Sequence, residues 1–256
     1  MSTPKIYLIT GANRGIGSGF TKFLLQRPST TVIAAVRDPS HSTSKDLADL
    51  PAAKDSKLIL VPLDSSVESA PKKAVEIIKQ DYDIKHIDVV IANAGIGADG
   101  GKVRTTTTEN ITKHFAVNTI GPVLLFQATA DLLQASPSKN PIFVAISTMI
   151  GSMGSMEMLE GFPTTHSPYG GSKAALNWFV RRLHFEEPWL TSFVFHPGLV
   201  ATDMSASVIA GTGLKLEDFG GISVDTSTTS MLSVIDGATR EIGGSFKNYD
   251  GTALPW

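Results

Sequence analysis

A tyrosine and a lysine stand four positions apart in SPYGGSKAAL, residues 167–176. In a helix this spacing puts the phenol of Tyr169 and the ammonium of Lys173 on the same face. A nearby positive charge favours the phenolate and lowers the pKa of a tyrosine from about 10, so such a pair can move a proton. Ser167 and Pro168 are favourable residues for the start of that helix. The same spacing also fits an amphipathic helix with one surface lysine, so the interpretation depends on the rest of the chain.

A glycine-rich turn near the start of the chain could hold a phosphate. The stretch TGANRGIG, residues 10–17, follows an apolar run and precedes a helical pattern. Glycines let the backbone turn tightly and approach a pyrophosphate, whose charge suits the N-terminus of the following helix. The spacing of Gly11, Gly15 and Gly17 therefore predicts a nucleotide site.

Short apolar runs recur along the chain, with helical patterns between them. The runs do not alternate polar and apolar residues, which is typical of strands buried on both faces of a parallel sheet. They cover residues 5–10, 31–36, 57–63, 87–93, 141–147, 191–198 and, more weakly, 243–249. Helical patterns cover residues 15–27, 43–50, 66–80, 109–135, 168–187 and 226–236. This alternation predicts one α/β domain over residues 1–256, a Rossmann-like, doubly wound parallel sheet of about seven strands flanked by helices.

Composition narrows the class of protein. The 256 residues carry a net charge of −2, which argues against a nucleic-acid partner or an anionic membrane surface. Without cysteine the chain has no disulfide, thiolate metal site or cysteine nucleophile, and its six histidines are scattered, so we expect no metal. No apolar run approaches the roughly 20 residues of a membrane span. We therefore expect a cytoplasmic protein.

Further motifs follow in chain order. ANAG (92–95) ends the fourth apolar run, Asn118 stands in FAVNTIG, and HPGLVATDM (196–204) follows the sixth run. Together with the glycine-rich turn and Tyr169-x3-Lys173, these stretches resemble the short-chain dehydrogenase/reductase family. The resemblance extends from residue 10 to residue 204. Within the family, LITGANRGIG and VVIANAGIG look closest to fungal norsolorinic-acid-type ketoreductases and to carbonyl reductases.

The resemblance implies a set of catalytic residues. Tyr169 would give a proton to the oxygen of a small-molecule carbonyl substrate. Lys173 would lower the pKa of Tyr169 and hold the nicotinamide ribose, and Asn118 would anchor a water that passes protons onward. A hydroxyl after the fifth strand should hold the substrate oxygen; Thr148 is the first choice and Ser147 the alternative.

The resemblance also implies a nicotinamide cofactor. An enzyme that prefers NAD usually has an acid at the end of the second strand. Here Arg37 follows that strand, and the acid Asp38 comes one residue later. Arg37 and Arg14 could pair with a 2′-phosphate, so we expect NADP(H) rather than NAD(H). The implied cofactor-binding residues are Gly11, Asn13, Arg14, Gly15, Ile16, Gly17, Arg37, Asp64, Ser65, Asn93, Ala94, Gly95, Tyr169, Lys173, Pro197, Gly198, Val200 and Thr202.

Two irregular segments, 148–166 and 203–224, follow late strands and are expected on the substrate side of the sheet. The first is longer than is usual in the family, and it either lines the crevice or encloses a small core of its own. The apolar residues of the two segments are Met153, Met156, Met158, Leu159 and Phe162, then Met204, Val208, Ile209, Leu214, Leu216 and Phe219. Because methionines adapt to varied ligands, a crevice lined by both segments would take a bulky apolar or aromatic ketone.

The leading prediction is an NADPH-dependent carbonyl reductase, such as one of polyketide or secondary metabolism. The alternatives are a nucleotide-binding redox sensor without turnover, and an enzyme of this fold that reduces imines or dehydrates its substrate. Relatives often pair through the helices that contain Asn118 and Tyr169, which predicts a homodimer or homotetramer. The long segment before Tyr169 would instead favour a monomer.

Overall fold

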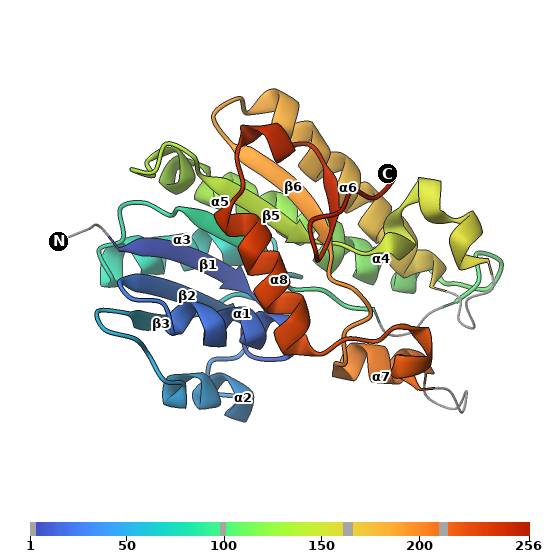
Figure 1. The fold of residues 1–256 in the computed structure, drawn as a ribbon, viewed down its shortest axis with the longest axis horizontal. Coiled ribbons are helices and arrows are strands. Elements are labelled where there is room, and N and C mark those ends of the chain that lie inside the picture. The colour runs from blue at the N-terminus through green and yellow to red at the C-terminus, as the bar shows by residue number, and fades with distance from the viewer. Residues whose placement is uncertain (1–3, 98–100, 161–165, 210–214) are drawn as a thin grey trace.

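The protein forms the parallel sheet that the apolar runs predict. A computed structural model describes residues 4–97, 101–160, 166–209 and 215–256, with the side chains of 207–209 left out. Its seven strands lie in the order β3-β2-β1-β4-β5-β6-β7, and every neighbouring pair is parallel (Figure 1). The strands are β1 (Lys5–Thr10), β2 (Thr30–Val36), β3 (Lys57–Pro62), β4 (Val89–Ala92), β5 (Ile142–Ile146), β6 (Thr191–His196) and β7 (Phe246–Asn248).

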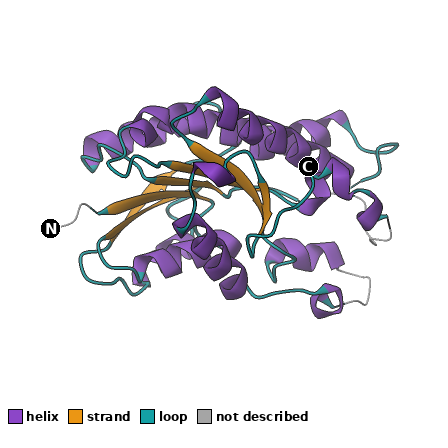
Figure 2. Ribbon diagram, turned by 45° about the horizontal axis from the view of Figure 1, so that its top comes forward, coloured by secondary structure: helices purple, strands orange, loops and turns teal. Residues whose placement is uncertain are grey.

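Helices cover both faces of this sheet, so that three layers are seen in Figure 2. The α-helices are α1 (Gly15–Leu25), α2 (Ser42–Lys45), α3 (Ala70–Asp81), α4 (Thr108–Phe115), α5 (Gly121–Gln134), α6 (Ser167–Glu186), α7 (Asp203–Ile209) and α8 (Val224–Asp236). Helices α3, α5 and α6 pack on one face, and α1 and α8 pack on the other. This is the Rossmann-like, doubly wound architecture.

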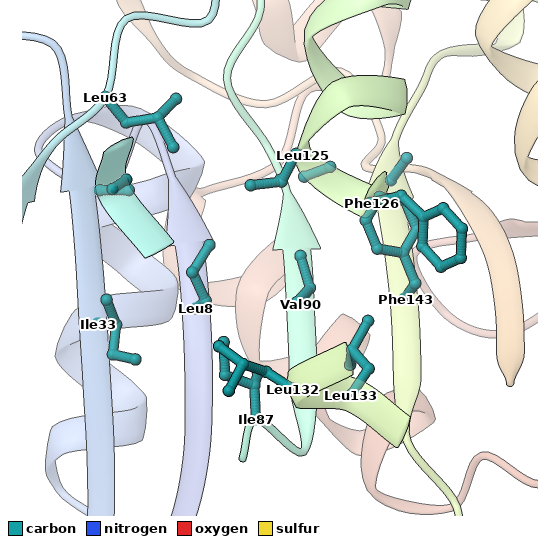
Figure 3. Close-up of a cluster of buried hydrophobic side chains, with 14 of the residues drawn as sticks. Leu8, Ile33, Leu63, Ile87, Val90, Leu125, Phe126, Leu132, Leu133 and Phe143 are labelled. Carbon is teal, nitrogen blue, oxygen red and sulfur yellow. The ribbon is translucent and has the colours of Figure 1, made fainter. Parts of the chain in front are cut away.

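Each face of the sheet has its own hydrophobic core, because the strands are apolar on both sides. On one face Leu8, Val90 and Phe143 of neighbouring strands meet Leu125 and Leu133 of α5 (Figure 3). Burial of a side chain of this size contributes roughly 1.5–3 kcal/mol. The cores therefore fix the sheet, and the sheet fixes where its strands end.

The expected single helix over residues 109–135 is interrupted. Between α4 and α5 the residues Ala116–Ile120 form a π-helical turn, in which Gly121 N donates to the Ala116 carbonyl five residues earlier. The apolar periodicity continues through the turn, so the pattern gives no sign of it. Such turns are frequent at functional sites, and this one contains Asn118.

The same helical stretch has the length and composition of a candidate membrane span. Within the part of the chain that the structure describes, Thr108–Gln134 alone is long and apolar enough to cross a bilayer, by length and composition only. Half of its most apolar window is buried inside the protein, as in the core helix of a globular fold.

The chain after β7 returns to the sheet edge and ties down the segment after β5. Leu254 N donates to Phe246 O at 2.9 Å, so residues 246–254 form a hairpin-like turn. Ser152 Oγ then donates to Pro255 O at 2.7 Å, and Gly154 N donates to Trp256 O at 2.5 Å. In Figure 1 the end of the chain lies next to this segment. Residues 149–160 are therefore held from the far end of the sequence.

Candidate active site

The glycine-rich turn has the geometry of a phosphate cradle. Gly11 and Gly15 have left-handed backbones, with φ of 63° and 51°, which glycine adopts without strain. A Cβ on Gly17 would lie 2.1 Å from the Gly11 carbonyl oxygen. Helix α1 begins at Gly15, so its free N–H groups and positive dipole end open at the turn. The predicted residues fit a pyrophosphate, and Ile16 anchors the turn against the core beneath α1.

The loop after β4 forms a second side of this cradle. Thr10 Oγ1 accepts hydrogen bonds from Asn93 N at 3.1 Å and Ala94 N at 3.0 Å. Asn93 Nδ2 donates to Thr10 O at 2.9 Å. The predicted stretch from Asn93 to Gly95 therefore lies beside the glycine turn. Thr10 was not among the predicted site residues. The sequence feature that could have indicated it is a hydroxyl side chain at the end of an apolar strand.

Two arginines follow the ends of β1 and β2. Arg14 and Arg37 are both exposed, and neither has a carboxylate partner among the described residues. Asp38 is occupied within its own turn: its Oδ1 accepts from Ser40 N at 2.8 Å and Ser40 Oγ at 2.6 Å. These bonds lower the pKa of Asp38. Two exposed arginines and one ionised carboxylate, with Oδ1 already engaged by Ser40, therefore stand at this edge of the sheet.

A cavity of about 520 Å³ opens beside the glycine turn, between α1, the α2 region and the chain after β6. Its lining includes Asn13, Gly15, Thr43 and Thr202. Asn13 Nδ2 donates to Thr43 Oγ1 at 2.7 Å, which holds the α2 region against the turn. The volume lies within the range of small-molecule and cofactor sites.

The remaining predicted cofactor residues lie on two flanking loops. After β6, the backbone of Gly198 is left-handed, with φ of 84°. Val200 pairs with Ile222 in a bridge, and a Cβ on Gly15 would lie 3.3 Å from Thr202 Cγ2. This places the segment from Pro197 to Thr202 against the glycine turn.

The loop after β3 reaches the start of α5. Asp64 Oδ1 accepts from Ser66 N at 2.9 Å and Ser66 Oγ at 2.7 Å, which forms a tight turn. A Cβ on Gly121 would lie 2.7 Å from Ser65 O. Asp64 and Ser65 are therefore packed close to the π-helical turn.

Tyr169 and Lys173 lie on the first turns of α6, as predicted. Lys173 Nζ donates to Ile146 O at 2.7 Å and lies 6.0 Å from the centroid of the Tyr169 ring. Burial lowers the pKa of Lys173 to about 7. Burial also raises the pKa of Tyr169 to about 12, against the opposing effect of its hydrogen bond with Thr148.

The pKa of Tyr169 in the protein without cofactor is set by burial, which outweighs any effect of the lysine charge. The phenol is therefore protonated at neutral pH. A protonated phenol is the form that can give a proton to a carbonyl oxygen. That Lys173 and the oxidised nicotinamide together lower this pKa concerns the site with its cofactor and stays a prediction.

The two candidate hydroxyls after β5 have different surroundings. The side chain of Thr148 acts on the phenol of Tyr169 as a hydrogen-bonding group and lowers its pKa, against the larger effect of burial. Ser147 Oγ instead donates to Asn177 Oδ1 at 2.5 Å, and Asn177 Nδ2 donates to Gly151 O at 3.1 Å. Of the two candidate hydroxyls, that of Thr148 therefore acts on the Tyr169 phenol, and that of Ser147 bonds to Asn177.

Asn118 joins the loop after β4 to α6. Its Oδ1 accepts from Ile96 N at 2.9 Å, and its Nδ2 donates to Ile96 O at 2.9 Å and to Ser172 Oγ at 3.0 Å. Both amide hydrogens are used, so the side chain can hold a water only through the second lone pair of Oδ1. A Cβ on Gly95 would lie 3.3 Å from this oxygen and 3.5 Å from Lys173 Nζ. The amide oxygen and the lysine thus face one small space, which glycine keeps open.

The two predicted apolar segments differ in what they contact. A Cβ on Gly97 would lie 2.9 Å from Met204 Sδ and 3.6 Å from Tyr169 Cε2, so Met204 of α7 and the tyrosine both lie beside Gly97. Met153, Met156 and Met158 are exposed, and thus do not enclose a core of their own. Phe162, Leu214 and the side chains of Val208 and Ile209 lie outside the described residues.

Three histidines near the site were not predicted. The rings of His114 and His166 lie 6.5 Å and 6.4 Å from that of Tyr169, centroid to centroid. His196 Nδ1 accepts from Met149 N at 3.3 Å, and burial lowers the pKa of His196 to about 4, so the ring is neutral and able to accept. The histidines are scattered in the sequence, and only the fold brings them together.

Known proteins share this arrangement. A family model described as short chain dehydrogenase matches residues 5–212. The norsolorinic acid ketoreductase nor1 of Dothistroma septosporum is 43% identical over 253 residues, 98% of this chain and 92% of that protein. The norsolorinic acid ketoreductase of Aspergillus parasiticus is 39% identical over 253 residues, 98% of this chain and 91% of that protein.

Solved structures agree in fold. The NADPH-bound carbonyl reductase from chicken fatty liver has a TM-score of 0.86 and 29% identity, with 100% of both chains covered. The carbonyl reductase Sniffer of Drosophila melanogaster has a TM-score of 0.82 and 26% identity, also with 100% of both chains covered. The chain therefore belongs to the short-chain dehydrogenase/reductase family of oxidoreductases.

Proposed function

We propose that this protein is an NADPH-dependent carbonyl reductase of the cytoplasm that acts on a bulky, apolar, aromatic ketone. The observation that carries the proposal is the grouping of Thr148, whose side chain acts on the pKa of Tyr169, with that tyrosine and with the buried Lys173 one helical turn away. The glycine cradle lies at the same edge of the sheet, where the parallel strands end. A pure binding protein has no need of this combination.

The residues divide the reduction of a ketone between them. NADPH, when bound, supplies the hydride that adds to the carbonyl carbon. Thr148 and Tyr169 donate hydrogen bonds to the carbonyl oxygen and so orient the substrate and stabilise the charge that develops there. Tyr169 gives its phenolic proton to that oxygen, and the product is an alcohol. Protonated Lys173 stabilises the phenolate that remains.

The preference for NADPH rests on charge at the ends of β1 and β2. Arg14 and Arg37 are exposed and can pair with the 2′-phosphate, which NADH lacks. Asp38, the acid that could otherwise accept from ribose hydroxyls, already accepts two hydrogen bonds from Ser40 at Oδ1, which leaves Oδ2 for that role. The NADPH-bound carbonyl reductase from chicken fatty liver supports the same choice.

The class of substrate rests on Met204 and on the relatives. Met204 Sδ approaches Gly97 beside the Tyr169 ring, and a thioether there favours an apolar, polarizable surface such as an aromatic ring. The names of the relatives from Dothistroma and Aspergillus specify norsolorinic acid as the ketone that those proteins reduce.

The assembly we propose is a homodimer through α6 and the turn between α4 and α5. Trp178 and Phe185 of α6 are 61% and 62% exposed, and Ile120, between α4 and α5, is 51% exposed. Such apolar surface on adjacent helices is typical of an interface. Light scattering of the purified protein tests this, and a monomeric mass would rule out the dimer.

The experiment that tests the function measures NADPH oxidation with a panel of ketones, from small aliphatic to polycyclic aromatic. We expect turnover concentrated among the aromatic members, abolished in Tyr169→Phe, with the affinity for NADPH unchanged in that variant. NADPH binding without turnover of any ketone would favour the sensor, and an imine or dehydrated product would reassign the reaction.

A further inference from the structure

His114 is a buried histidine whose tautomer can be assigned from its surroundings. It is 1% exposed and lies one residue before the end of α4. Its Nδ1 lies 2.9 Å from the carbonyl oxygen of Asn110, one turn earlier in the helix. A carbonyl oxygen only accepts, so Nδ1 carries the hydrogen. In the neutral ring Nε2 is then a hydrogen-bond acceptor.

This acceptor has no hydrogen-bond partner within the described parts of the chain, although it is buried. Most buried polar side-chain atoms in folded proteins have a partner, because an unpaired one loses its hydration without compensation. An apolar side chain of similar size would avoid that loss. The histidine at this position therefore calls for a functional explanation.

The unpaired acceptor belongs to a ring beside the proposed acid. The rings of His114 and Tyr169 lie 6.5 Å apart, centroid to centroid, and meet edge to face at 67°. The rings of His166 and Tyr169 lie 6.4 Å apart, centroid to centroid, and burial lowers the pKa of His166. Both histidines thus lie close to the phenol, where a substrate would be held.

The polar groups around the site differ in their hydrogen-bonding role: some are donors and one is an acceptor. Thr148 and Tyr169 are donors, and their natural ligand is the carbonyl oxygen. His114 Nε2 is an acceptor, and its natural ligand is a hydroxyl. A substrate with both groups, a ketone on a ring system that also carries a phenolic hydroxyl, would satisfy all three residues.

We propose that His114 is a specificity-determining residue that accepts a hydrogen bond through Nε2 from a phenolic hydroxyl of the substrate. The substrate class is thereby narrowed to hydroxyaryl ketones. The proposal rests on the carbonyl-reductase function above and adds to it the second group that the enzyme recognises. A ketone without the hydroxyl leaves the acceptor unpaired and is discriminated against.

The test compares 1-tetralone with its 5-, 6-, 7- and 8-hydroxy isomers, using NADPH and the intact protein. We expect the wild type to favour at least one hydroxytetralone over 1-tetralone by about tenfold to a hundredfold in kcat/KM. His114→Phe should remove this preference, so that the ratio of kcat/KM between the hydroxytetralone and 1-tetralone falls to about one. His114→Gln, which keeps an acceptor, should restore part of the preference.

The ratio between two substrates on one preparation is insensitive to the fraction of folded enzyme, so a destabilised variant remains informative. An unchanged ratio in His114→Phe, or no preference in the wild type, would overturn the role of His114. Wild-type enzyme that reduces no ketone in this series or in the wider panel would instead overturn the proposed function.

Discussion

Replacing Thr148 by valine removes one hydroxyl and keeps the shape of the side chain. This hydroxyl acts on the Tyr169 phenol as a hydrogen-bonding group and lowers its pKa. Loss of one preorganised donor to a developing oxyanion costs about 2.7–4 kcal/mol, so kcat should fall by about 10²–10³. The fold should suffer little, because the other hydrogen bond of this hydroxyl, from Ile150 N, is long at 3.3 Å.

Replacing Ser147 by alanine should have the opposite effect: it should lower the stability of the fold and leave kcat nearly unchanged. Its hydroxyl donates to Asn177 Oδ1 at 2.5 Å, and both residues are buried. The alanine variant leaves that oxygen without its donor, which should lower the free energy of unfolding by about 1–3 kcal/mol. For a chain of this size each kcal/mol lowers the melting temperature by about 2–4 °C. We expect kcat to stay within about threefold of the wild type.

The assay pairs steady-state NADPH oxidation with thermal unfolding on the same preparations, with Thr148→Ser as the control that keeps a hydroxyl. Thr148→Val should be stable and slow, Ser147→Ala less stable and active, and Thr148→Ser close to the wild type in both. A slow Ser147→Ala with an active Thr148→Val would refute the assignment of the donor.

Three further perturbations test the cofactor site and the buried lysine. Gly17→Ala puts a Cβ 2.1 Å from Gly11 O, so the turn must move; NADPH titration should show a loss of at least about tenfold in affinity, and unchanged affinity would contradict the cradle. Arg37→Ala should weaken NADPH by about tenfold and NADH hardly at all, whereas equal losses for both would remove the 2′-phosphate contact. Lys173 has a pKa of about 7 in the folded protein and 10.5 in the unfolded chain. At a pH between these values the unfolded chain therefore holds a proton on Lys173 that the folded protein has lost. Stability without cofactor should therefore rise from pH 7 to pH 10, by at most about 1.4 kcal/mol per pH unit, as measured by urea unfolding. Lys173→Met should flatten that rise, and a slope that survives the substitution has another source.

The fold was predictable because the strands β1 to β6 lie in largely apolar runs bounded by polar or turn residues. The predicted runs 5–10 and 57–63 match β1 and β3 to within a residue. The glycine spacing and Tyr169-x3-Lys173 depend only on local geometry, so the sequence also indicated where the candidate site lies. The choice between Thr148 and Ser147 could not be made from sequence. Adjacent residues of extended chain point to opposite sides, and only the packed partners show which side holds Tyr169.

Features that depend on burial and on distant residues were not accessible from the pattern. The π-helical turn leaves the apolar periodicity intact, so the break in the helix over residues 109–135 was missed. The pKa directions of Tyr169 and Lys173 follow from burial, which a spacing does not specify. A histidine such as His114 on a helix has the appearance of an ordinary core residue until its unpaired nitrogen is located.

The last residues of the chain affect the order in which the protein folds during synthesis, because Pro255 and Trp256 hydrogen-bond Ser152 and Gly154. The residues of the Ser152–Pro255 bond are 103 positions apart in the chain. Strands β1 to β5 and the glycine turn emerge from the ribosome well before them and can begin to pair. The segment that follows Thr148 can reach its final packing only when residues 246–256 have been synthesised. During synthesis the chain would therefore acquire the glycine turn and the adjoining loop after β4 first, and its substrate side last.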